Sequence, residues 1–270
     1  MISTYYLPAV PYPIQRINID GRIVEFCAPN EVTDRVLVAH DGQSVFNPDA
    51  AKNGQTWKLA ETAATISTEL GTNFPLIVAI WHQGQVGDSV SRGLDLSPEA
   101  YFKSGMELFP KNGPFDVSAI KGDEYLNNIF NKYLPAVVSL SNVVQSPEKT
   151  AMIGASRGAL CSLYALRNHG DQFKTAIAHS THWPIGKDPL VRMTIGGIPA
   201  PGEHRIWMSH GSEGFDAEYQ PFQKLANRLM IKKGYRENMD FHFNYYPGGD
   251  HKESDWAKQA ADSLQFWLKK

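Results

Sequence analysis

The chain has 270 residues, of which 42% are hydrophobic and 20% are charged. A chain of this length can bury a full core as one large α/β unit, so we predict a single domain over residues 1–270. The net charge is -2 and no run of like charge stands out, which gives no general electrostatic reason to bind nucleic acid or an anionic membrane. These features favour a small-molecule substrate.

Segments that would target the chain to a membrane or for secretion do not stand out. No stretch approaches the roughly eighteen apolar residues of a membrane span, and residues 1–14 lack the basic start and apolar core of a secretion signal. We therefore expect a soluble, cytoplasmic protein. Its two cysteines, Cys27 and Cys161, do not indicate a disulfide framework. Assembly into a homo-oligomer is left open.

The chain begins with a predicted hairpin and continues with alternating strands and helices. Residues 16–26 alternate apolar and polar side chains around Asp20-Gly21, a dipeptide that suits a tight turn, so we predict two antiparallel strands at a sheet edge. Short apolar runs predict further strands at 35–39, 74–81, 150–153, 173–178, 205–209 and 240–246. Helical spacing predicts helices at 57–70, 123–140, from 159 onward, 216–233 and 254–268.

Three further features refine this outline. Pro135 is expected to kink or end the helix over residues 123–140. The stretches 82–98 and 101–122 show no clear period and are predicted to be loops. Continuous apolar strands alternating with helices then predict an α/β fold with a mostly parallel central sheet, antiparallel N-terminal strands and helices on both faces. In such a sheet ligands collect at the carboxyl ends of the strands, so the loops there are the places to search.

The pentapeptide Gly154-Ala155-Ser156-Arg157-Gly158 lies between a predicted strand and a predicted helix. Gly-x-Ser-x-Gly in this setting is typical of a nucleophile elbow, in which a strand turns straight into a helix and holds the serine in a strained backbone conformation. Side chains at either glycine would clash, because the two elements come close together. The pattern alone is weak, since small residues also occur in such turns for packing reasons. Ser156 is the candidate nucleophile.

A serine hydroxyl needs a base, a carboxylate to hold the base, and donors for the oxyanion. His251 is the candidate base, because it follows the last predicted strand on a glycine-containing loop. Glu213 and Asp216 are the candidate acids, since both follow a strand end in the chain order serine, acid, histidine. Glu213 is nearer the strand end, and Asp216 also suits a helix N-cap. For Asp250, beside the histidine, a capping or surface role is favoured.

The predicted oxyanion hole combines two parts of the chain. One donor is the backbone N–H of Arg157, directly after the nucleophile, and the other comes from Gly42 or Gln43 in the loop after the strand at 35–39. Asp41-Gly42 is also an ordinary turn dipeptide. Around the site, four residues that follow strand ends are candidates for the walls of a substrate pocket or for packing under the loops: Trp81, His82, His182 and Trp183. Arg92 is considered as a partner for a substrate carboxylate, although a lone loop arginine is usually solvated.

Three motifs together resemble one known family. They are His40-Asp41-Gly42-Gln43-Ser44-Val45-Phe46, the Gly-x-Ser-x-Gly pentapeptide, and Gly248-Gly249-Asp250-His251 followed by Trp256. They look like the putative-esterase family of α/β-hydrolases, which includes esterase D (S-formylglutathione hydrolase), feruloyl and enterochelin esterases and the mycolyltransferases. The resemblance runs from about Val36 to the C-terminus. It implies an α/β-hydrolase fold and serine hydrolysis of acyl esters.

The resemblance also assigns roles to residues of this chain. It implies that Ser156 and His251 act as nucleophile and base, and it favours Asp216 over Glu213 as the acid. Arg157 departs from the Met or Gln that many members carry, and a bulky cation there would alter acyl selectivity.

We therefore predict a serine carboxylic-ester hydrolase that acts on a small-molecule ester through an acyl-Ser156 intermediate, with His251 as base and then acid. No metal and no organic cofactor is expected. One alternative is acyl transfer to an alcohol or sugar by the same residues. Another is a catalytically silent hydrolase fold that serves as a binding module. The identity of the ester lies in loop shapes that the sequence does not define.

Overall fold

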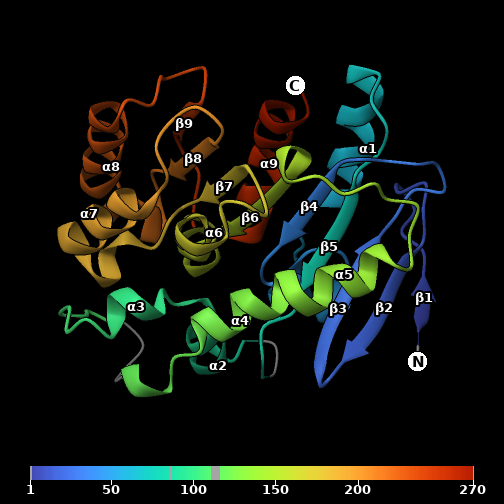
Figure 1. The fold of residues 1–270 in the computed structure, drawn as a ribbon, viewed down its shortest axis with the longest axis horizontal. Helices are drawn as coiled ribbons and strands as arrows, with labels where there is room; N and C mark the ends of the chain where they lie inside the picture. Colours follow the sequence, from blue (N-terminus) through green and yellow to red (C-terminus); the bar gives the residue numbers. More distant parts are fainter. Residues whose placement is uncertain (1, 85–86, 111–115, 270) are drawn as a thin grey trace.

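The computed structural model describes residues 2–84, 87–110 and 116–269. At its centre lies a nine-stranded sheet in the order β1-β2-β3-β5-β4-β6-β7-β8-β9 (Figure 1). The strands are β1 (Ser3–Tyr5), β2 (Ile14–Ile19), β3 (Arg22–Cys27), β4 (Val36–Ala39), β5 (Leu76–Ile80), β6 (Thr150–Ala155), β7 (Thr175–His179), β8 (Arg205–Gly211) and β9 (Phe241–Tyr246).

The sheet has an antiparallel start and a parallel remainder. β1, β2, β3 and β5 pair antiparallel in turn, and β5, β4, β6, β7, β8 and β9 then pair in parallel. The predicted hairpin is confirmed, with Asp20 and Gly21 at positive φ in its turn. Its predicted edge position is wrong, because β1 pairs outside β2. A three-residue strand is too short to show the alternation that predicts a strand.

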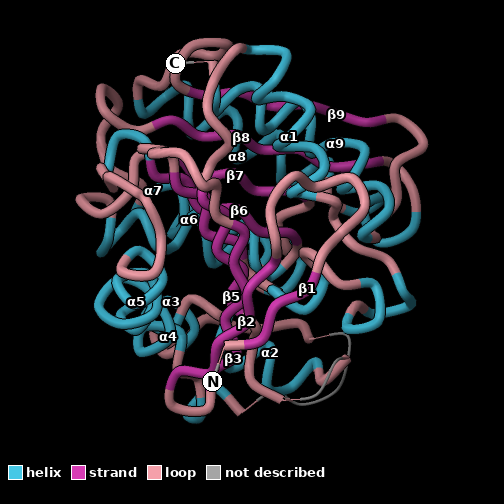
Figure 2. The backbone as a smooth tube through the Cα atoms, turned by 90° about the vertical axis from the view of Figure 1, so that its right-hand side faces the viewer, coloured by secondary structure: helices cyan, strands magenta, loops and turns pink. Residues whose placement is uncertain are grey.

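Helices cover both faces of the sheet, as predicted (Figure 2). Side chains from α1 and α9 form the core on one face, and side chains from α4, α6, α7 and α8 contribute to the core on the other. The helices are α1 (Leu59–Leu70), α2 (Ser89–Leu96), α3 (Glu99–Phe102), α4 (Gly122–Asn128), α5 (Leu134–Val138), α6 (Arg157–His169), α7 (Lys187–Gly197), α8 (Gln220–Lys233) and α9 (Glu253–Leu268). Among the described residues, no helix is both long and apolar enough to cross a bilayer.

The prediction of a loop over residues 82–98 is wrong, because this stretch contains α2. Asp88 begins the helix as its N-cap, and its carboxylate accepts hydrogen bonds from the backbone of Val90 and Ser91. The helix is short and carries Gly93, so it lacks a long apolar period. The stretch 101–122 has a 3₁₀ turn at Val117–Ala119, and its residues 111–115 lie outside the described part of the chain. α7 was also not predicted, although Leu190, Val191, Thr194 and Ile195 share its buried face.

The helix predicted over residues 123–140 forms without a break at Pro135. α4 passes into a π-helical turn, Ile129–Tyr133, and then into α5, and Figure 1 shows them as one continuous run. Pro135 has no N–H to donate, and the wider turn directly before it accommodates this loss. The helix predicted from residue 216 begins later, at Gln220. Asp216 instead lies in a 3₁₀ turn, Gly214–Glu218.

His179, the last residue of β7, is fully buried beneath α9. Its ring nitrogens contact the hydroxyls of Ser209 and Ser263 at 2.8 and 3.2 Å and the amide oxygen of Gln259 at 3.2 Å. Burial lowers the pKa of His179 from 6.5 to about 4, because the charged form is poorly solvated there. The unfolded chain therefore binds a proton between these two pH values and the folded chain does not, so stability falls as the pH drops through this window.

Replacing His179 should flatten the pH dependence of stability. On going from about pH 7 to about pH 5, we expect the wild-type protein to lose more unfolding free energy than His179→Gln. The difference should be on the order of 1 kcal/mol for each pH unit below 6.5. Urea unfolding of both proteins at each pH measures it. Equal pH slopes for the two proteins would contradict the assignment.

Candidate active site

Ser156 lies at the turn where β6 meets α6. Its backbone has φ 57 and ψ -119, a conformation that costs a non-glycine residue roughly 1–3 kcal/mol. The surrounding backbone holds it there: the Ser156 N–H donates to the carbonyl of His179 at 2.9 Å, and the Ser156 carbonyl accepts from the N–H of His182 at 3.2 Å. The predicted strained turn is therefore present, between the strand and the helix that the sequence predicts.

The two glycines of the elbow differ in how strictly they are needed. A Cβ added to Gly154 would lie 2.2 Å from the carbonyl carbon of Gly158, so no side chain fits. A Cβ added to Gly158 would lie 3.2 Å from Asp41 Oδ2 and from the Cβ of His40, which is tight but less severe. The predicted clash is therefore strong at the first glycine and milder at the second.

Asp216 is fully buried behind the end of β8. Its Oδ2 accepts hydrogen bonds from the Ser180 hydroxyl at 2.6 Å and the Gly211 N–H at 2.7 Å, and its Oδ1 lies 2.7 Å from His251 Nδ1. Burial alone would raise the pKa of this carboxyl, but the imidazole of His251 and the two other donors outweigh it and lower the pKa. The carboxylate is therefore charged at neutral pH and fully hydrogen-bonded.

His251 lies on the loop after β9 and faces that carboxylate. Since the carboxylate accepts, Nδ1 carries the proton and Nε2 is the acceptor nitrogen. Three aromatic rings meet the imidazole at steep angles, with centroid distances of 5.9 Å for Phe215, 5.5 Å for Tyr219 and 5.0 Å for Trp256. The side chain is only 12% exposed. Its orientation is thus set by a hydrogen bond and by packing together.

The other acid candidates take no part in this pair. Glu213 is exposed, and its carboxylate accepts from the hydroxyl of Ser212. Asp250 accepts the backbone N–H of His251 at 2.6 Å and so orders the loop locally. The helix-cap alternative for Asp216 is wrong, since that carboxylate points to His251 and α8 begins four residues later.

Two residues near this pair were missed in the sequence. Ser180, at φ 47 just after β7, donates to Asp216 and accepts from the indole N–H of Trp256 at 3.0 Å. The Tyr219 hydroxyl lies 2.9 Å from His182 Nδ1, and Ser156 is close enough to influence the phenol. Burial and then the charge of Asp216 raise the pKa of Tyr219 far above its ordinary value, so it stays a neutral phenol. Tyr219 thus contacts both His182 and His251. Its position one turn beyond Asp216 was the signal in the sequence that could have identified it.

The loop after β4 contains the expected oxyanion residues. Asp41 has φ 54, and Gly42–Ser44 form a 3₁₀ turn. A Cβ on Gly42 would lie 2.7 Å from the backbone of Ala79 and from the ring of Trp81, so this position has no room for a side chain. The side chain of Gln43 exchanges two hydrogen bonds of 3.3 Å with the backbone of His82. The Gln43 side chain thus joins two loops. That the backbone N–H of Gly42 or Gln43 donates to an oxyanion stays a prediction.

The four candidate wall residues have different surroundings. Trp183 is fully buried and donates to Gln223 at 3.0 Å, which favours the alternative of packing under the loops. The Trp81 indole donates to Glu25 at 3.1 Å and lies under the guanidinium of Arg16. These contacts hold Trp81 against the N-terminal hairpin. A wall role for Trp81 and for His82, which is buried, stays a prediction. His182 contacts Tyr219 directly, beside Ser156.

Arg157 opens α6 directly after Ser156. Its guanidinium donates to the hydroxyl of Ser97 at 2.8 Å. Burial and the nearby charge of Arg92 lower the pKa of Arg157 to about 10, so it still carries a positive charge at neutral pH. Within residues 2–84, 87–110 and 116–269 there is no group of three or more histidine, cysteine or acidic side chains that could hold a metal ion.

The fold and these side chains together define a class. A mostly parallel sheet with helices on both faces, a serine on a strand-to-helix turn, and a later carboxylate and imidazole on strand-end loops are the features of an α/β-hydrolase. Residues 120–266, more than half of the chain, match the family described as Putative esterase. The chain belongs to this family.

Solved structures agree in fold. BES protein from Bacillus cereus superposes with a TM-score of 0.66 at 16% identity, covering 98% of this chain and 94% of that one. Siderophore hydrolase EstA from Aspergillus nidulans gives 0.67 at 16% identity with the same coverage. Enterobactin esterase from Shigella flexneri gives 0.64 at 15% identity, and all of this chain covers 59% of that protein.

Among curated proteins, the uncharacterized protein YbbA of Bacillus subtilis (strain 168) is 28% identical over 155 residues. The match covers 54% of this chain and 60% of that protein. The chain thus spans less than two thirds of the length of this relative and of the Shigella esterase.

Asp216 and Glu213 can be compared directly by conservative amide substitutions. Asp216→Asn keeps the side-chain shape but cannot accept the Nδ1–H of His251 while it also satisfies Ser180 and Gly211, so kcat for an ester should fall by a factor on the order of 10³. Glu213→Gln, on the exposed surface, should change kcat by less than about twofold. Steady-state ester hydrolysis, with thermal unfolding as a check on folding, measures both. The reverse ranking would exchange the two residues' roles.

Proposed function

We propose that this chain hydrolyses carboxylic esters of small molecules through an acyl-Ser156 intermediate. The observation that carries the proposal is the 2.7 Å contact between Asp216 and His251, on the loops after β8 and β9, together with the strained elbow at Ser156. Membership of the esterase family supports ester hydrolysis. The names of two structural neighbours, an enterobactin esterase and a siderophore hydrolase, agree with an ester as the bond that is cleaved.

In the first half of the reaction, His251 Nε2 takes the proton of Ser156 Oγ while that oxygen bonds to the ester carbonyl carbon. The carbonyl oxygen becomes an oxyanion, which accepts from the backbone N–H of Arg157 and from that of Gly42 or Gln43. Asp216 holds the Nδ1–H and stabilises the imidazolium. His251 then gives its proton to the leaving alkoxide as the ester C–O bond breaks.

In the second half, water attacks the acyl carbon and His251 Nε2 takes a proton from it. The acyl bond to Ser156 breaks, the proton returns to Oγ, and a carboxylic acid leaves. These steps use side chains and backbone N–H groups of this chain and water alone, so we retain the proposal of a site without metal or organic cofactor. A cytoplasmic, single-domain protein without nucleic-acid or membrane partners remains part of the same proposal.

A serine-reactive fluorophosphonate should label Ser156 and abolish ester turnover. Ser156→Ala should remove both labelling and activity, because no other group replaces the nucleophile. Ser162→Ala is the matched control: this serine lies on α6 and bonds the carbonyl of Gly158, so its loss should leave labelling intact. Peptide mapping by mass spectrometry locates the label. An active protein with Ser156 unlabelled would overturn the mechanism, and an unlabelled, inactive protein would favour the binding-module alternative.

Hydrolysis and acyl transfer can be separated by product analysis. With p-nitrophenyl esters of increasing acyl length and an excess of an alcohol or sugar acceptor, we expect the free acid to remain the main product. The acyl-length profile then defines the acyl group that the site accepts. A dominant new ester in the presence of the acceptor would show that acyl transfer is the activity. Ser156→Ala, run in parallel, corrects for uncatalysed hydrolysis.

A further inference from the structure

A single guanidinium connects the two loops that the proposed reaction depends on. Arg92, on α2, makes a two-point ion pair with Asp41: Nε to Oδ1 is 2.6 Å and Nη2 to Oδ2 is 2.8 Å. The same Nη2 donates to the carbonyl of Ala155 at 3.3 Å. Asp41 directly precedes Gly42 and Gln43, and Ala155 directly precedes Ser156. Arg92 therefore bridges the ends of β4 and β6.

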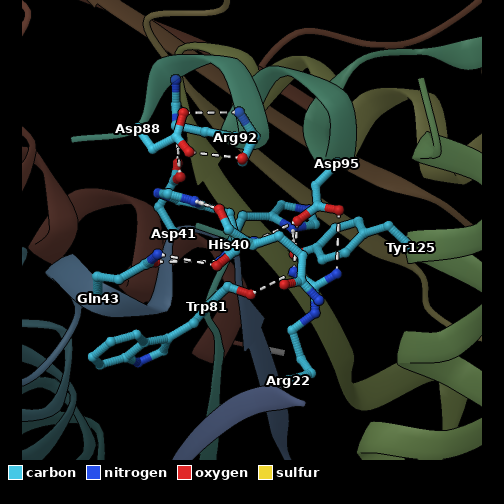
Figure 3. Close-up of polar contacts among 12 residues, drawn as sticks. Arg22, His40, Asp41, Gln43, Trp81, Asp88, Arg92, Asp95 and Tyr125 are labelled. Atoms are coloured by element: carbon cyan, nitrogen blue, oxygen red, sulfur yellow. Dashed lines mark hydrogen bonds and ion pairs between the residues drawn. The ribbon is translucent and has the colours of Figure 1, made fainter. Parts of the chain in front are cut away.

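This arrangement contradicts the idea that Arg92 awaits a substrate carboxylate. The guanidinium of Arg92 is already paired with the carboxylate of Asp41 (Figure 3). The pair is poorly accessible, with side chains 25% exposed for Arg92 and 12% for Asp41. Burial alone would raise the pKa of Asp41, but the charge and hydrogen bonds of Arg92 outweigh it and keep the pKa low. Asp41 is therefore a charged side chain that forms a structural ion pair with Arg92.

The ion pair acts on a part of the backbone that needs support. Asp41 has φ 54, in the left-handed region that side chains disfavour, and the 3₁₀ turn at Gly42–Ser44 begins from it. Its carboxylate lies beside the first turn of α6, since a Cβ on Gly158 would come within 3.2 Å of Oδ2. The direction of the Gly42 and Gln43 N–H groups relative to Ser156 thus depends on where this carboxylate is held.

α2 is itself held firmly at both ends. Asp88 caps its N-terminus and also accepts from the Ser91 hydroxyl. Near its C-terminus Asp95 pairs with Arg22 of β3, at 2.5 and 3.2 Å, and accepts the N–H of Gln83 at 2.7 Å. Figure 3 shows the two ion pairs on the same helix. One of them connects α2 to the hairpin, and the other connects it to the site.

We propose that Arg92 is a positioning residue that preforms the oxyanion hole by fixing the Asp41–Gln43 backbone against the nucleophile elbow. The inference rests on the proposed esterase function and extends it to α2. Arg92 itself does not touch the ester. It acts on the transition state through the position of backbone N–H groups, so its loss should lower kcat far more than it raises KM.

Arg92→Gln tests this with Arg22→Gln as the matched control. Both variants remove the arginine of a two-point ion pair on α2, but only Arg92 reaches the elbow. We expect Arg92→Gln to lower kcat at least about tenfold with KM within about twofold, and Arg22→Gln to keep kcat within about twofold. Arg92→Lys, which keeps the charge but loses the fork, should fall between wild type and Arg92→Gln.

A second readout separates positioning from general loss of stability. A boronic acid forms a tetrahedral adduct with the active serine, so its affinity should fall in Arg92→Gln by a factor similar to that for kcat. Asp41→Asn should reproduce the effect, and the double variant Asp41→Asn/Arg92→Gln should be no worse than the single ones. Thermal unfolding of each variant records folding, and if Arg92→Gln does not fold, Arg92→Lys and Asp41→Asn provide the same comparison.

The outcomes are distinguishable from failure of the esterase proposal. Fluorophosphonate labelling and turnover of the wild-type protein test that proposal alone. If the wild-type protein is active and folded Arg92→Gln keeps its kcat, the positioning role is overturned. It is equally overturned if Arg22→Gln loses as much kcat and boronate affinity as Arg92→Gln.

Discussion

When a strand turns directly into a helix, a single residue has to reverse the chain, and here that residue is Ser156. The reversal is feasible only because Gly154 allows the carbonyl of Gly158 to approach to a distance at which any side chain would overlap it. The elbow backbone is then joined to the loop after β7, through His179 and His182. The ends of β6 and β7 thus share one hydrogen-bonded frame, and Ser156 lies at the carboxyl end of the parallel strand β6.

Two buried carboxylates, on opposite sides of the elbow, depend on partners from distant parts of the chain. Asp216 is satisfied by His251, Ser180 and the Gly211 backbone, and Asp41 is satisfied by Arg92. A buried charge without such partners would be strongly unfavourable, so each carboxylate imposes the position of the groups around it. On one side this orients the imidazole. On the other it orients the loop that begins at Gly42.

Aromatic packing supports the same geometry. Trp256 packs against His251 and donates to Ser180, so one indole contacts both the imidazole and a donor to Asp216. Tyr219 contacts the imidazole of His251 with its ring and His182 with its hydroxyl. Rotation of His251 away from the elbow would therefore disturb several contacts at once. This is the rigidity that a preorganised site requires.

Local patterns in the sequence determined the fold class and the strand-to-helix turn at Ser156, because each depends on residues near one another in the chain. The sequence also gives the order of Ser156, Asp216 and His251 directly. Tertiary structure shows that Asp216, and not Glu213, pairs with His251: both acids follow β8, and the 3₁₀ turn directs one carboxylate inward and leaves the other exposed. It also placed α2, whose short, glycine-containing sequence lacks a clear period, and paired Arg92 with Asp41 across 51 positions of sequence. Contacts such as the Arg92–Asp41 ion pair depend on the order of strands in the sheet and on the need to pair buried charges. They join loops that are far apart in the sequence, so local periodicity does not predict them.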